Sequence, residues 1–100
     1  MSRYTVYVIP QAWLEMKNLP GHMRQRVKQA IEELSDNPRP SNSKELEAAD
    51  LEGELRRLRL DRWRVVYAIT EIDNVVDVLA VRKRPPYDYG DLKELLEQAQ

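Results

Sequence analysis

The chain has 100 residues, a length that fits one domain with one modest hydrophobic core. Its 16 basic and 17 acidic residues leave a formal net charge of −1, so any nucleic-acid site must come from local separation of charge. Cysteine is absent, which excludes disulfides, thiol nucleophiles and thiolate zinc sites.

The first segments predict a strand followed by two helices. Tyr, Val and Thr alternate over residues 3–9, which is typical of a strand. Pro10 ends this strand and suits the first turn of a short helix over residues 11–19. After Pro20 and Gly21, apolar residues recur at helical spacing and predict a second helix over residues 21–35. The residues of the short helix expected to point inward are Trp13, Met16 and Leu19.

The later segments predict mainly strands. In order they are a loop over 39–43, a helical turn or loop over 44–51, a strand–turn–strand hairpin over 54–69, a turn over 71–74 and a strand over 75–81. Pro85 and Pro86 oppose regular pairing after the last strand. Asp91 would cap a final helix over residues 91–98.

These elements predict an α+β fold in a single domain over residues 1–100. An N-terminal strand and a helical hairpin precede a three-stranded antiparallel meander, which completes a four-stranded sheet, and a C-terminal helix follows. Two helices joined by so short a turn should pack antiparallel on one face of the sheet. The other face would then be partly open to solvent.

The hairpin over residues 54–69 contains five arginines and has two unlike faces. If its turn is Asp61-Arg62, then Arg59 faces Arg64, and directly paired residues share a face of the sheet. One face is apolar and suits a core: it carries Leu58, Leu60, Trp63, Val65 and Tyr67. The other face carries Arg57, Arg59 and Arg64 beside Val66 and Ala68.

The arginine-bearing face needs an explanation, because like charges directly opposite each other destabilise a sheet. The ordinary explanation is the solvated face of a half-buried antiparallel sheet. Three features favour an anion-binding face instead. The residues are arginine, which suits bidentate phosphate contacts; only Asp61 interrupts the run; and a second basic cluster, Arg82-Lys83-Arg84, follows the next strand.

The hairpin phrase over residues 58–67, LRLDRWRVVY, resembles the "RxRxGDYRVxY" phrase of the RelE/ParE superfamily of type II toxins. The strand over 75–81, followed by basic residues and nearby tyrosines, is similar to that family's final strand and ending. The resemblance covers nearly the whole chain. It implies a RelE-like fold and a bacterial toxin paired with an antitoxin. RelE-type members cleave messenger RNA in the ribosomal A site, whereas ParE-type members inhibit DNA gyrase.

The resemblance also implies roles for particular arginines. By position, Arg57 and Arg59 match two basic residues of the family's second strand, and Arg64 matches the arginine that starts its third strand. Arg84 matches the arginine after its fourth strand. The chain departs from the family in one respect, because RelE-type sites often have lysine where Arg57 and Arg59 stand. Related branches carry histidine or glutamate as acid–base groups.

RNA cleavage needs no metal or other cofactor if the ribose 2′-hydroxyl attacks the adjacent phosphate. It then needs a proton acceptor, a proton donor and positive charge on the phosphate. Arginine supplies the charge but is a poor base, whereas a tyrosine among arginines is a better one. The tyrosine implied by the resemblance is Tyr89 or Tyr87, because the prolines leave its spacing ambiguous. Phosphate stabilisation is then assigned to Arg59, Arg64 and Arg84, and further RNA contacts to Arg57, Arg62, Arg82 and Lys83.

Three functions are compatible with the sequence. They are a ribosome-dependent messenger RNA endoribonuclease, a ParE-like gyrase inhibitor without catalysis, and a degenerate toxin that only binds its antitoxin. The expected partners are a cognate antitoxin, the ribosome and its messenger RNA. An acidic or amphipathic antitoxin segment that folds on binding would suit the basic surface. No apolar run approaches membrane-spanning length, so we expect a cytoplasmic protein without a membrane partner.

Overall fold

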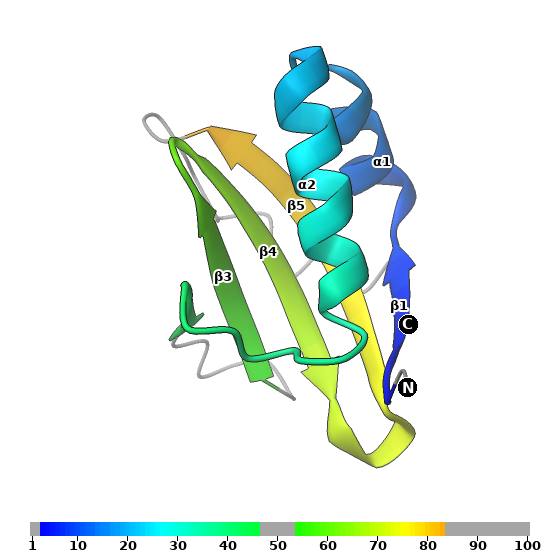
Figure 1. Ribbon diagram of the computed structural model, residues 1–100. Helices are drawn as coiled ribbons and strands as arrows, with labels where there is room; N and C mark the ends of the chain where they lie inside the picture. The colour runs from blue at the N-terminus through cyan, green and yellow to red at the C-terminus, as the bar shows by residue number, and fades with distance from the viewer. Residues whose placement is uncertain (1–2, 47–53, 84–100) are drawn as a thin grey trace.

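Two helices lie on one face of a five-stranded sheet in the computed structural model, which describes residues 3–46 and 54–83 (Figure 1). In chain order the elements are β1 (Thr5–Val8), α1 (Pro10–Lys17), α2 (Gly21–Glu33), β2 (Ser43–Leu46), β3 (Glu54–Leu60), β4 (Trp63–Thr70), a 3₁₀ turn (Glu71–Asp73) and β5 (Val75–Lys83). The strands lie in the order β1-β5-β4-β3-β2. β1 runs parallel to β5, and the other neighbours are antiparallel. The predicted α+β class is confirmed.

The predicted four-stranded sheet is wrong by one strand, because β2 lies where the sequence indicates a loop or a helical turn. β2 pairs antiparallel with β3, and Lys44 lies opposite Arg57. Its sequence, SKEL, has low intrinsic β propensity. The strand forms because β3 offers it an otherwise unpaired edge of backbone donors and acceptors. The predicted C-terminal helix over residues 91–98 lies outside the described residues.

The β3–β4 hairpin has the predicted turn and register. Leu60 pairs with Trp63 and Arg59 pairs with Arg64, which leaves Asp61-Arg62 as the two-residue turn. Asp61 adopts a φ of 56°, the left-handed conformation that tight hairpin turns require. Aspartate tolerates this conformation better than most residues, which explains how the turn forms without glycine.

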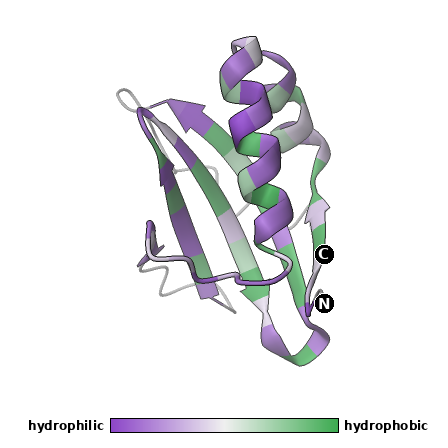
Figure 2. Ribbon diagram, in the orientation of Figure 1, coloured by the Kyte–Doolittle hydropathy of each residue, from purple (hydrophilic) through white to green (hydrophobic). Residues whose placement is uncertain are grey.

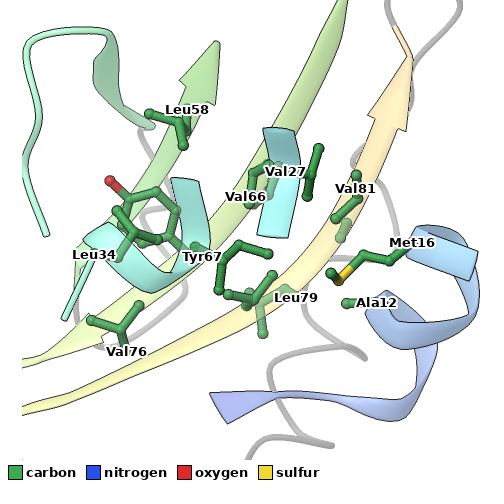
Figure 3. Close-up of a cluster of buried hydrophobic side chains, with 14 of the residues drawn as sticks. Ala12, Met16, Val27, Leu34, Leu58, Val66, Tyr67, Val76, Leu79 and Val81 are labelled. Carbon is green, nitrogen blue, oxygen red and sulfur yellow. The ribbon is translucent and has the colours of Figure 1, made fainter. Parts of the chain in front are cut away.

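The main core lies between the two helices and the sheet (Figure 3). The predicted apolar stripe of α2 is confirmed, because its buried residues are Met23, Val27 and Ile31. The prediction that Trp13 points inward is wrong, since its side chain is 53% exposed. Met16 and Leu19 are buried as predicted, with exposures of 4% and 5%. α1 begins at Pro10 and buries Ala12 in place of Trp13, and the small Ala12 lets the helix approach β5. Neither described helix is long and apolar enough to cross a membrane.

The face of the sheet opposite the helices is partly open, as the sequence predicts, but much of its middle is buried. The register places Leu55, Val66 and Ala68 on this face, and all three are buried, with exposures of 1%, 0% and 3%. Near-continuous apolar runs in β4 and β5 are typical of strands that are buried on both faces. The arginines therefore gather at one end of this face and do not spread along it.

Tyr67 anchors the loop after α2 to the sheet. Its ring is fully buried in the core, and its hydroxyl donates a hydrogen bond of 2.6 Å to the Pro38 carbonyl (Figure 3). Burial raises the pKa of the Tyr67 hydroxyl, so the group stays protonated and remains a donor. The prediction that Tyr67 belongs to the core is confirmed.

Tyr67→Phe is expected to lower the free energy of unfolding by about 1–2 kcal/mol, because the buried Pro38 carbonyl would lose its donor while the ring stays in place. Equilibrium urea denaturation followed by circular dichroism measures this loss. Tyr7→Phe is the matched control, since Tyr7 is 55% exposed and should change stability by less than about 0.5 kcal/mol. Equal losses in the two variants would rule out the anchoring role.

A polar network joins the loop after α2 to the end of the sheet that lies away from the hairpin turn. Arg39 donates to Glu54 at 2.8 Å and also pairs with Glu71, while the Tyr4 hydroxyl donates to Glu71 at 3.0 Å. Arg56 donates to the second oxygen of Glu54, also at 2.8 Å. Hydrogen bonds from Arg39 hold the pKa of the Glu54 carboxyl below its ordinary value of 4.5.

This lowered pKa predicts an acid-dependent loss of stability. A carboxylate with a depressed folded-state pKa contributes its full stability above the ordinary value, and the contribution is lost as pH falls through the folded-state pKa. Glu54→Gln should therefore be less stable than the wild type near neutral pH, and the difference should shrink below pH 4.5. Thermal unfolding across this range measures the gap. A gap of constant size would contradict the assignment, and Glu33→Gln on the exposed face of α2 serves as the control.

Candidate functional site

Three arginines lie in line across three neighbouring strands, at the end of the sheet that carries the hairpin turn. The register pairs Arg59 of β3 with Arg64 of β4, and Arg64 with Arg82 of β5. Paired residues share a face, and Arg59 alternates with the buried Leu58 and Leu60. The three side chains, which we call the arginine row, therefore lie on the face opposite the helices. In Figure 2 the end of β5 is hydrophilic where it comes near the hairpin turn.

The three members of the arginine row are exposed to very different extents. Arg59 is exposed, whereas Arg64 has only 5% of its surface accessible. The Nη1 of Arg64 donates to the carbonyls of Asp61 and Trp63 at 2.7 and 2.9 Å. These bonds satisfy a buried charge and hold the turn closed. Arg64 thus lies beneath the surface of the row, where its bonds help to shape the turn.

Arg82 is held by a carboxylate of α1. β1 ends before Pro10, and the last bond between β1 and β5 joins the Ile9 N–H to the Val78 carbonyl at 3.1 Å. Further along the same edge of β5, the Glu15 side chain of α1 accepts a hydrogen bond that a neighbouring strand would otherwise accept. Its Oε1 accepts the Val81 N–H at 2.9 Å, and its Oε2 accepts the Arg82 Nε at 3.1 Å. The arginine row therefore includes a cation whose orientation is set by the helix.

Asn42 holds the backbone of Arg59 by two hydrogen bonds. The Arg59 N–H donates to the Asn42 carbonyl at 3.0 Å, and the Asn42 Nδ2 donates to the Arg59 carbonyl at 3.1 Å. These bonds extend the β2–β3 ladder by one residue. Neither Asn42 nor Glu15 belongs to a motif, and only knowledge of the strand order would have indicated their roles.

The other predicted site residues are distributed around this row. Arg57 is half-buried on the same face, where it pairs with Val66 of β4. Arg62 is exposed in the turn. Lys83 is exposed but lies opposite Trp63, on the other face of the sheet from Arg82. Three predicted residues lie outside the described part of the chain: Arg84, Tyr87 and Tyr89.

An open hollow adjoins the row at the hairpin turn. Met23 of α2 and Trp63 of β4 supply its apolar lining, and the other lining residues are Arg59, Asp61 and Arg62. Asp61 forms an ion pair with Arg26 of α2, so the helix is tied to the turn. We call this feature the tip hollow. Arg59 belongs to the arginine row and also lines the tip hollow.

This arrangement can bind and stabilise anions. Arginine is planar, permanently charged and rich in donors, which suits phosphate oxygens better than a point charge does. It cannot accept a proton, so the contribution of the row is electrostatic. The described part of the row therefore has the chemistry of an anion-binding surface.

Known proteins share both the sequence pattern and the fold. Residues 10–85 match the family described as ParE toxin of type II toxin-antitoxin system, parDE. The fold is similar to an archaeal RelE–RelB complex from Pyrococcus horikoshii, with a TM-score of 0.74 and 25% identity over 85% of this chain and 99% of that one. It is also similar to the toxin–antitoxin complex RelBE2 from Mycobacterium tuberculosis, with a TM-score of 0.69 and 26% identity over 82% and 99%. The intact RelBE complex of E. coli gives a TM-score of 0.64 and 23% identity over 80% and 95%. No curated protein sequence matches the chain significantly.

Proposed function

Since this chain belongs to the RelE/ParE superfamily of type II toxins, we propose that it cleaves messenger RNA on the ribosome and thereby inhibits translation. The observation that carries the proposal is the arginine row, in which Arg59, Arg64 and Arg82 occupy one register line across three strands. The two similar structures at 25% and 26% identity support it, because their toxin chains are RelE proteins.

The proposed reaction requires no metal. The ribose 2′-oxygen attacks the adjacent phosphorus while its proton leaves to a base, and the bond from phosphorus to the 5′-oxygen breaks as that oxygen gains a proton. The products are a cyclic phosphate and a free 5′-hydroxyl. Negative charge grows on the non-bridging oxygens during this step, and preorganised guanidinium groups stabilise it.

The residues divide these tasks in the proposal. Arg59, which is exposed and has a fixed backbone, contacts the phosphate, and Arg64 contributes charge from beneath the surface. Arg84 adds positive charge, and Tyr89 or Tyr87 transfers the proton. Arg57, Arg62, Arg82 and Lys83 supply further contacts with RNA.

The match to the ParE toxin family favours a second candidate function. A ParE-like toxin would inhibit DNA gyrase by binding it, without catalysis. The arginine row would then contact an acidic protein surface in place of a phosphodiester.

An antitoxin is proposed as the partner under either function. The similar structures from Pyrococcus horikoshii and Mycobacterium tuberculosis are toxin–antitoxin complexes. A partner segment with carboxylates would complement the arginine row and would compete with RNA for it. Binding of the antitoxin and binding of RNA should therefore exclude one another.

Induction of the protein in growing bacteria separates the two candidate functions. Protein synthesis and plasmid supercoiling are followed over the same minutes after induction. The endoribonuclease proposal expects protein synthesis to stop while supercoiling is unchanged. Early loss of negative supercoiling with continued translation would establish the gyrase inhibitor, and normal growth would contradict both.

A further inference from the structure

The tip hollow combines an aromatic surface with two exposed cations. Trp63 is half-buried, packs against the core and also lines the hollow beside Met23. Arg59 and Arg62 are exposed at its rim. A hydrophobic ring that is fully covered would serve the core alone. The Trp63 ring is only half-buried, so part of its surface is available for contact with a molecule in the hollow.

The charge of the tip hollow is positive, although an aspartate belongs to it. The Asp61 carboxylate is engaged by Arg26, so it is already neutralised by a residue of α2. The ion pair also links α2 to the turn beside the hollow. The turn conformation is held from within by Arg64, whose guanidinium donates to the Asp61 carbonyl.

We propose that the tip hollow binds one nucleotide of single-stranded RNA, with the base against Trp63 and Met23 and the flanking phosphates on Arg59 and Arg62. Stacking of an unpaired base on an aromatic ring beside arginines is the usual chemistry of single-strand binding. The inference rests on the proposed function and extends it. RNA would pass from the arginine row, by way of the shared Arg59, around the hairpin turn.

The two tryptophans of the chain make the inference testable by fluorescence. Trp13→Phe removes the exposed tryptophan of α1 and leaves Trp63 as the reporter, while Trp63→Phe leaves Trp13 as a matched control. Each purified full-length variant is titrated with a single-stranded hexa-adenylate. Saturable quenching is expected for the Trp63 reporter and not for the Trp13 reporter. Arg62→Ala in the Trp13→Phe background should weaken the binding about fivefold through the loss of one phosphate contact, and Arg62 is exposed in the turn.

The outcomes separate this inference from the proposed function. Unchanged Trp63 fluorescence in a protein that still cuts messenger RNA on ribosomes would overturn the nucleotide site and leave the endoribonuclease standing. Saturable quenching of Trp63 without any cleavage would support the site and count against the endoribonuclease. Quenching by an acidic peptide but not by the hexa-adenylate would assign the tip hollow to a protein partner and overturn the inference. Because Trp63 also packs against the core, the Arg62→Ala result decides the matter if Trp63→Phe fails to fold.

Discussion

Arg59→Ala is expected to slow the cleavage of messenger RNA on programmed ribosomes by about 100-fold or more. Removal of one preorganised donor from developing negative charge typically costs roughly 10²–10³ in rate. The fold should survive, because Arg59 is exposed and its backbone is held by Asn42 through bonds that the substitution does not touch. Single-turnover cleavage, followed by primer extension, measures the rate.

A second cation serves as the control for this prediction. Lys28 is exposed on the outer face of α2, so Lys28→Ala removes the same charge at a place remote from the arginine row. It should leave the cleavage rate within about twofold of the wild type. If both variants lose activity equally, net charge and not the geometry of the row governs the reaction. If neither loses activity, Arg59 has no part in it.

Glu15→Ala is expected to lower the free energy of unfolding by about 2–3 kcal/mol and to reduce cleavage as well. The carboxylate serves two groups, the Val81 N–H and the Arg82 guanidinium, whose side chain is only 18% exposed. Loss of one partner from a largely buried pair leaves the other charge poorly compensated. Urea denaturation gives the stability, and the assay on programmed ribosomes gives the rate.

The matched variant Glu15→Gln distinguishes the two tasks of this residue. Glutamine keeps an oxygen for the Val81 N–H but loses the charge that holds Arg82. Only part of the stability should therefore return, because the Val81 N–H regains an acceptor while the Arg82 charge stays poorly compensated, and the cleavage rate should stay low. A double-mutant cycle with Arg82→Ala should give a coupling energy of about 1 kcal/mol or more. Additive effects would show that Glu15 and Arg82 act independently.

The hairpin was predictable because two independent constraints agree on it. A two-residue turn at Asp61-Arg62 sets which residues pair, and the alternation of leucine with arginine sets which face is buried. A slip by one residue would put Arg59 into the core. The sequence therefore predicted the pairing of Arg59 with Arg64, on which the candidate site depends.

The unpredicted strand β2 and the exposed Trp13 have the same cause. In both places, contacts with segments distant in the sequence decided the structure, and the local sequence pattern did not. β2 exists because β3 had a free edge, and nothing within SKEL requires a strand. Trp13 is exposed because the helix starts at Pro10 and packs on β5 through Ala12, so the largest apolar residue was a poor guide. The second face of the sheet was expected to be partly open, and the long apolar runs in β4 and β5 explain why its middle is buried.

Only part of the candidate site could be predicted from the sequence. Arginines were easy to single out by type, but their alignment into one row depends on the pairing of β4 with β5, which places Arg82 and not Lys83 beside Arg64. Glu15 approaches from a helix 66 positions away in sequence from the Val81 N–H that it accepts. Such a contact has no local pattern, because it arises where β1 ends and α1 covers the remaining edge of β5.

The salt dependence of RNA binding tests the phosphate-binding role of the arginine row most directly. Each phosphate contact with single-stranded RNA should contribute roughly −0.7 to the slope of log affinity against log salt. We expect a slope of about −2 to −3 for the wild type and a slope shallower by about 0.7 in Arg59→Ala. A slope in Arg59→Ala equal to that of the wild type would contradict the account, because Arg59 would then contact no phosphate.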